Sequence, residues 1–288
     1  MPLTETQKGD LFVFSEAVLW AFFPVVTALT LKFLPPFASL AYSSLFAAVF
    51  FAAAMLVRGK FSELRRRGIW TYVFLSVFFI GWLFYGLFFV GLKFTTAGNA
   101  GIISLMELFF SYLWFVVWKK EEFLRAHTAG AVLMLAGAVI ILFPKRGLSF
   151  HGGDLIILAA TACAPLGNYY QQKLRRRISS ETMMFLRSLL TFPVFFGALF
   201  IFRLNPSGAA LRGALWLLLL NGTLLLGLSK IFWLEAIHRI TVTKANALAS
   251  VGPFFTLIFA YMILGERPEI WQWLSLVPIA TGTWLLTA

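Results

Sequence analysis

The sequence has few charged residues and almost no cysteine. Charged side chains make up 12% of the 288 residues, whereas a soluble domain averages about 25%. The single cysteine, Cys163, excludes a disulfide framework and a cysteine-rich metal site. Zinc-protease, phosphate-loop and serine-elbow motifs are also missing, and the three histidines are dispersed along the chain. We therefore predict no enzyme, no metal and no cofactor.

Apolar residues are in large excess. Hydrophobic residues make up 60% of the chain, more apolar surface than a soluble fold of this length can bury. Lipid is the solvent that accommodates such an excess, and one crossing takes about 20 apolar residues. We predict an all-α integral membrane protein with ten spans, at residues 10–32, 35–57, 69–92, 96–118, 124–143, 153–173, 182–203, 211–236, 243–264 and 269–287.

The net charge of +12 comes from short basic runs between the spans. If the N-terminus is cytoplasmic, the two long runs at residues 58–67 and 173–177 both face the cytoplasm, as the positive-inside rule requires. Anionic lipid then accounts for the charge, so no nucleic-acid partner is expected. We predict a bacterial inner-membrane protein with both termini in the cytoplasm. The first apolar stretch is too long for a signal peptide and is expected to stay as the first span.

Two halves of the chain repeat one another, residues 1–147 and 148–288. Matched elements recur in the same order at a near-constant offset: Gly9-Asp10-Leu11 with Gly153-Asp154-Leu155, Gly81 with Gly227, residues 96–100 with 243–247, Glu121 with Glu266, and Gly137 with Gly282. Each half has five predicted spans, so the second half must enter the membrane from the opposite side. Such inverted repeats are typical of secondary transporters, whose site lies between the halves near the midplane.

With Gly265-Glu266-Arg267 before an apolar span that holds Gly282, this pattern resembles the EamA family of the drug/metabolite transporter superfamily. The resemblance covers the whole chain. It implies a central cavity lined by spans 3, 4, 8 and 9 with help from 1 and 6, and the movement of small metabolites, often amino acids and often outward. There are two departures from the pattern. Lys120-Glu121-Glu122 stands where the second half has Gly265-Glu266-Arg267, and Met106-Glu107 aligns with Pro253-Phe254.

Glu107 is the most informative ionisable residue, because it lies at the centre of the fourth span. A lone charge at that depth costs about 2.5–3.5 kcal/mol on insertion scales, so it must face the bundle interior, pair with a cation or hold a proton. We predict that Glu107 binds a substrate ammonium or carries a coupling proton. A structural hydrogen bond between helices is the alternative.

Four other ionisable residues lie well within the predicted spans or close to an inner end, and one of them, Glu235, is predicted to be interfacial. Lys230 is predicted to bind a substrate carboxylate, to pair with an acid, or to reach the inner surface with its long stem. Glu16 lies at similar depth and is its candidate partner, as well as a second candidate proton carrier. Arg187 is within reach of the inner surface, so we predict a structural role.

Aromatic and amide side chains complete the predicted substrate site. The aromatic candidates could stack on a ring or attract a cation, and packing is the alternative for each of them. The candidates are Trp20, Trp82, Tyr85, Tyr169 and Trp233, with the amides Asn168 and Asn221. The repeat-related Asn99 and Asn246 are instead predicted to make hydrogen bonds between helices.

Together these features predict a secondary transporter that works by alternating access on a small polar metabolite, an amino acid or a related amine, and exports it. No ATP-binding motif is present, so a gradient must drive uphill transport. Proton coupling, facilitated diffusion and exchange all stay open. The alternative is a lipid flippase or scramblase, or a membrane-embedded enzyme that acts on a lipid.

Overall fold

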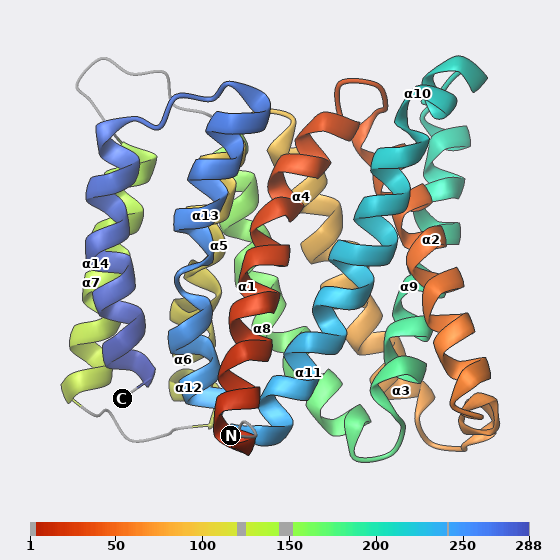
Figure 1. Ribbon diagram of the computed structural model, residues 1–288, viewed down its shortest axis with the longest axis horizontal. Helices are drawn as coiled ribbons and strands as arrows, with labels where there is room; N and C mark the ends of the chain where they lie inside the picture. The colour runs from red at the N-terminus through yellow and green to blue at the C-terminus, as the bar shows by residue number, and fades with distance from the viewer. Residues whose placement is uncertain (1–3, 120–124, 144–151, 241, 288) are drawn as a thin grey trace.

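The computed structural model describes residues 4–119, 125–143, 152–240 and 242–287. All regular structure in these residues is helical, and the helices stand side by side as a bundle (Figure 1). The end of the bundle that carries residue 4, at the lower edge of Figure 1, is called the N-terminal end below, and the other is called the opposite end. The predicted all-α class is confirmed.

Helical segments of the first half follow the predicted spans closely. They are α1 (Glu5–Thr30), α2 (Pro36–Val57), the short 3₁₀ helix η1 (Phe61–Arg65), α3 (Trp70–Ser76), the π-helical η2 (Val77–Phe84), α4 (Tyr85–Leu92), α5 (Ala97–Ser104), α6 (Met106–Lys119) and α7 (Arg125–Leu142). The third span is thus α3–η2–α4, and the fourth is α5–α6.

The second half repeats this order. Its segments are α8 (Gly152–Arg175), α9 (Ser180–Ile201), α10 (Gly208–Leu219), the π-helical η3 (Leu220–Leu228), α11 (Ser229–Arg239), α12 (Val242–Ala249), α13 (Gly252–Phe259), the π-helical η4 (Ala260–Leu264) and α14 (Ile270–Thr287). Together the described segments form ten successive helical stretches along the bundle. Among the described residues, six helices are long and apolar enough to span a membrane by length and composition alone, and Gly252–Leu264 is a shorter apolar helix.

The two halves run in opposite directions. In Figure 1, α1 rises from the N-terminal end, whereas its counterpart α8 starts at the opposite end and descends. Repeat-related helices also pack in pairs, α2 against α9 and α7 against α14, while α1 packs on α11 as α8 packs on α4. The predicted inverted repeat is therefore visible in the arrangement of the helices. The exact division at residue 147 stays a prediction.

Local sequence accounts for several helix ends and contacts. Thr4 caps α1, because its hydroxyl accepts from the amide of Gln7 while the Gln7 side chain accepts from the amide of Thr4. Glycines allow α7 and α14 to approach closely, since a Cβ on Gly130 would lie 2.7 Å from the carbonyl oxygen of Gly282.

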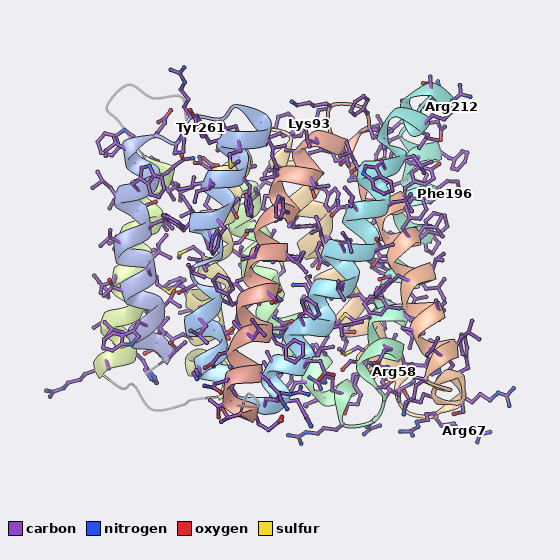
Figure 2. All side chains as sticks on the ribbon, in the orientation of Figure 1. Arg58, Arg67, Lys93, Phe196, Arg212 and Tyr261 are labelled. Atoms are coloured by element: carbon purple, nitrogen blue, oxygen red, sulfur yellow. The ribbon has the colours of Figure 1, made fainter. Side chains whose placement is uncertain are left out.

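Charged and apolar side chains separate along the bundle. Arg58 and Arg67 lie at the N-terminal end, and Lys93 and Arg212 lie at the opposite end (Figure 2). Large apolar side chains are exposed on the flanks between them, including Trp216 at 69%. A lipid environment accommodates this exposed apolar surface.

Both halves break a helix at a related point. In the fourth span, Leu105 interrupts the helix between α5 and α6, and in the ninth span residues 250–251 separate α12 from α13. Broken helices near mid-membrane leave backbone groups free and point helix ends into the bundle, an arrangement known from secondary transporters.

Candidate functional site

A cavity of about 520 Å³ lies between the two halves of the bundle. Pro24 and Phe88 mark its limit toward the opposite end, and Arg175 and Ile237, in the last turns of α8 and α11, mark its limit toward the N-terminal end. Its volume falls within the roughly 300–1,000 Å³ typical of small-molecule sites. The lining thus reaches the last residue of α8 at the N-terminal end and stops at least one helical turn short of the opposite end.

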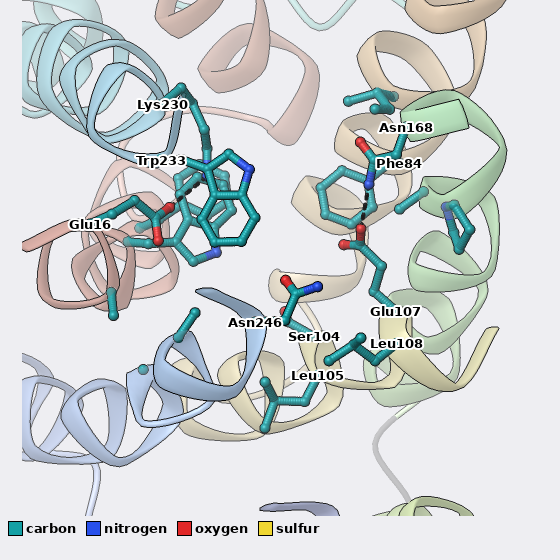
Figure 3. Close-up of a pocket in the computed structure, with 18 of the residues that line it drawn as sticks. Glu16, Phe84, Ser104, Leu105, Glu107, Leu108, Asn168, Lys230, Trp233 and Asn246 are labelled. Atoms are coloured by element: carbon teal, nitrogen blue, oxygen red, sulfur yellow. Dashed lines mark hydrogen bonds and ion pairs between the residues drawn. The ribbon is translucent and has the colours of Figure 1, made fainter. Parts of the chain in front are cut away.

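Glu107 lies on the cavity wall in the first turn of α6, directly after the break at Leu105. Asn168 of α8 donates a hydrogen bond from Nδ2 to Oε1 of Glu107 at 2.5 Å (Figure 3). The start of a helix carries a partial positive charge, which favours a carboxylate at this position. Among the described residues, no cation lies within ion-pair distance of Glu107.

Lys230 lies across the cavity from Glu107 (Figure 3). Its Nζ is 3.0 Å from Oε1 of Glu16 and 3.4 Å from the centre of the Trp20 ring. Of the three roles predicted for Lys230, the structure supports pairing with an acid. The pair neutralises both charges, and the Trp20 ring further stabilises the ammonium.

The predicted aromatic and amide residues fall into two groups. Trp20, Tyr85, Asn168, Tyr169 and Trp233 line the cavity with Glu16, Glu107 and Lys230.

Trp82 and Asn221 lie outside this lining. Trp82 donates its indole N–H to the carbonyl of Leu190 at 3.2 Å, and Asn221 is fully buried and donates to Thr27 Oγ1 at 3.1 Å. Hydrophobicity and depth cannot distinguish the two groups, because the helix face that each residue occupies depends on packing.

Arg187 is a cavity residue, which its place in the sequence did not predict. The side chain is 6% exposed, lines the cavity and has its guanidinium carbon 5.5 Å from the centre of the Tyr85 ring. Gln171 of α8, also not predicted, is 8% exposed and lines the same cavity. The depth of Arg187 in its span was the available signal, but a sequence does not show whether a side chain turns inward or reaches the surface.

A polar network closes the bundle at the opposite end. Asp154, at 2% exposure, accepts hydrogen bonds from Thr95 and from Asn99 Nδ2, and Asn99 Oδ1 accepts from Gln272 Nε2 at 2.7 Å. Glu266 accepts from the backbone amides at the start of α5. The predicted interhelical bonds of Asn99 are present, whereas Asn246 lines the cavity.

Two inverted five-helix halves around a cavity that holds charged side chains, with a broken helix in each half, define a membrane transport protein. The chain belongs to the EamA-like transporter family, whose model matches residues 7–143 and again 151–288. It is therefore an integral membrane transporter of a small molecule and not an enzyme. Among the described residues there is also no cluster of His, Cys, Asp and Glu that could hold a metal.

Known proteins similar to this chain agree with that assignment. YoaV of Bacillus subtilis, an uncharacterized transporter, is 22% identical over 97% of both chains. The aromatic amino acid exporter YddG of Ancylobacter novellus is 27% identical over 61% of this chain and 62% of the relative. A crystal structure superposes with a TM-score of 0.68 over 96% of both chains at 18% identity, which shows the shared fold.

Proposed function

We propose that this chain is a secondary transporter that exports an amino acid or a related amine by alternating access. One observation carries the proposal: Glu107 faces the cavity between the halves, at the start of a broken helix, and its hydrogen-bond partner is the neutral Asn168. A carboxylate in that position can accept a substrate ammonium without first breaking an ion pair. The name of the exporter from Ancylobacter novellus supports both the substrate class and the outward direction.

Alternating access is supported by the inequality of the two ends. The cavity reaches toward the N-terminal end, while the Asp154 network ties helices together at the opposite end. If the N-terminal end faces the cytoplasm, as the loop charges predict, this arrangement would take up substrate from inside the cell. Because the halves are inverted copies, exchange of their conformations would open the other side.

Glu107 also has the surroundings of a proton carrier, and the proposal includes proton coupling as its second role. Glu16 is the other candidate, but it is paired with Lys230 and would have to leave that pair to take up a proton. Glu107 needs no such rearrangement, so it is the better candidate.

The test is counterflow of radiolabelled amino acids and amines in proteoliposomes, with the native chain and Glu107→Gln. A charge-assisted hydrogen bond is worth about 1.5–3 kcal/mol, so we expect flux to fall by roughly 10- to 100-fold. Glu235→Gln is the matched control, because Glu235 pairs with Arg239 and does not line the cavity. It should transport like the native chain.

Other outcomes separate the alternatives. Full flux in Glu107→Gln would remove Glu107 from the site. Retained binding with lost pH dependence would assign it the proton role. Scrambling of labelled lipid with no metabolite flux in the native chain would favour a lipid-handling protein and overturn the proposal.

A further inference from the structure

We propose that Arg187 binds a carboxylate of the substrate, so that the transported molecule carries an ammonium and a carboxylate together. The inference rests on the proposed transport function and specifies its substrate class. It concerns a residue that the sequence placed in a structural role, and it assigns that residue to the cavity wall.

Arg187 is buried in the bundle without an acidic partner. Its side chain is 6% exposed and lines the cavity. Among the described residues it takes part in no ion pair and no side-chain hydrogen bond, and its contact is with the Tyr85 ring. Attraction to a ring face acts on the charge and leaves the five N–H donors free. The guanidinium therefore faces the cavity with its donors unpaired, and an anion that enters the cavity can pair with it.

The other two cations of the cavity wall differ from Arg187. Lys230 is already neutralised by Glu16, and Arg175 is the last residue of α8, half-buried at the N-terminal limit of the cavity, where water can reach it. Arg187 thus combines burial, a free charge and a place on the cavity wall. The planar guanidinium also matches a carboxylate in two-point geometry, which an ammonium does not.

Gln171, another residue of the cavity lining, also has a donor without a partner. It lies on α8, and its Nε2 atom is buried with no hydrogen-bond acceptor in the described residues. Buried polar atoms in native proteins are almost always satisfied, so an unpaired amide beside a cavity suggests a missing acceptor. A carboxylate has acceptor capacity for both the guanidinium and an amide.

Glu107 completes the case for a zwitterion. Of the charged side chains on the cavity wall, the carboxylate of Glu107 and the buried guanidinium of Arg187 have no ion-pair partner among the described residues. A substrate with only an ammonium would leave Arg187 unpaired, and one with only a carboxylate would leave Glu107 unpaired. A molecule that carries both groups supplies a partner for each side chain, and Trp20, Tyr85 and Trp233 suit an apolar or aromatic remainder.

The test uses three probes with one carbon skeleton: L-phenylalanine, phenethylamine, which lacks the carboxylate, and 3-phenylpropionate, which lacks the ammonium. Uptake into proteoliposomes is measured for the native chain, Arg187→Gln, Arg187→Lys and the control Arg212→Gln, because Arg212 is exposed at the opposite end (Figure 2) and does not line the cavity. We expect the native chain and Arg212→Gln to prefer L-phenylalanine over phenethylamine by about tenfold or more, as a lost charged hydrogen bond implies.

Arg187→Gln should lose that preference and keep its phenethylamine uptake, while Arg187→Lys should restore part of the preference through charge alone. An equal fall in the uptake of both probes would show a structural role and overturn the proposal. An unchanged preference for L-phenylalanine would overturn it as well.

A second measurement separates this inference from the transport proposal. Phenylglyoxal modifies accessible arginines, and the modified residues of the purified chain are mapped by mass spectrometry with and without benzoate. We expect benzoate to protect Arg187 but not Arg175, whether or not any probe is transported. If Arg187 reacts without protection, or does not react at all, the carboxylate site is overturned. Protection without transport would leave the site standing and reject the proposed function.

Discussion

At the opposite end of the bundle Asp154 binds Asn99, whereas at the N-terminal end the repeat-related Asp10 binds Lys244 and Asn246 lines the cavity. Both acids lie in the first two turns of the first helix of their half, and both amides lie near the start of the broken helix. The same sequence element is therefore joined through a buried hydrogen bond at one end and through a half-exposed ion pair at the other.

This difference shows how two similar halves produce an asymmetric molecule. Asp154 is 2% exposed, and its network draws α5, α8 and α14 together. The side chains of Asp10 and Lys244 are 38% and 44% exposed, and the cavity lies between the helices deeper in the bundle. Under alternating access, the ends should exchange these arrangements, so that Asp10 meets Asn246 when Asp154 leaves Asn99.

The largest effect expected from this comparison is on stability at the two acids. Asp154→Ala leaves the buried donors of Asn99 and Thr95 without an acceptor, so we expect a loss of about 2–3 kcal/mol in unfolding free energy. Asp10→Ala breaks an exposed ion pair, which is worth at most about 1 kcal/mol. Thermal unfolding in detergent measures both. Equal losses would mean that the two ends are closed to the same degree.

A smaller contrast is expected at the two amides. Asn99→Ala removes a link between Asp154 and Gln272 and should cost about 1–3 kcal/mol, since both partners are buried. Asn246→Ala changes a side chain on the cavity wall and should alter stability by no more than about 0.5 kcal/mol. The same unfolding assay distinguishes them. A large loss in Asn246→Ala would indicate that its end is held shut in much of the population.

The smallest expected effect is a difference in how two loop acids, Glu63 at the N-terminal end and Glu266 at the opposite end, make the stability depend on pH. Burial by itself raises the pKa of Glu63, but hydrogen bonds from Ser179 and Thr182 outweigh it, so the pKa lies below its usual value. Burial raises the pKa of Glu266 above its usual value, although the amides of Ala97 and Gly98 oppose the shift.

The two pKa shifts make the free energy of unfolding change with pH in opposite directions. Glu63 stabilises the folded chain above its usual pKa, and this contribution is lost as pH falls through the lowered folded value. The contribution of Glu266 is complete below its usual pKa and is lost as pH rises through the raised value. The free energy of unfolding is measured at several pH values for both variants. Glu63→Gln should reduce the loss of stability at acidic pH, and Glu266→Gln should remove the loss of stability toward neutral pH. Parallel pH curves for the two variants would contradict this assignment.

Much of the architecture follows from local chemistry. Apolar segment lengths predict the ten crossings, and the recurrence of Gly-Asp-Leu with an odd number of spans predicts the inversion seen for α1 and α8. The depth of Glu107 in a span predicts an interior position, because an unpaired charge in lipid is costly. These inferences need only the order of residues and the thickness of the membrane.

Other features could not be predicted, because they depend on which helix faces meet. Trp82 and Tyr85 are neighbours in one span, yet Tyr85 lines the cavity and Trp82 bonds to Leu190 on α9. The break at Leu105 has no proline or glycine at that position to announce it. Both depend on packing between segments that are distant in the chain.

The sequence by itself determined the membrane environment, the helix count, the repeat and the presence of a few charges too costly to be left in lipid. Only the tertiary structure decided how those charges are paired. It joined Lys230 to Glu16, left Arg187 facing the cavity and placed Asn168 against Glu107. The physical reason is that hydropathy is a sum along the chain, whereas an ion pair depends on a few ångströms between helices that the chain brings together only on folding.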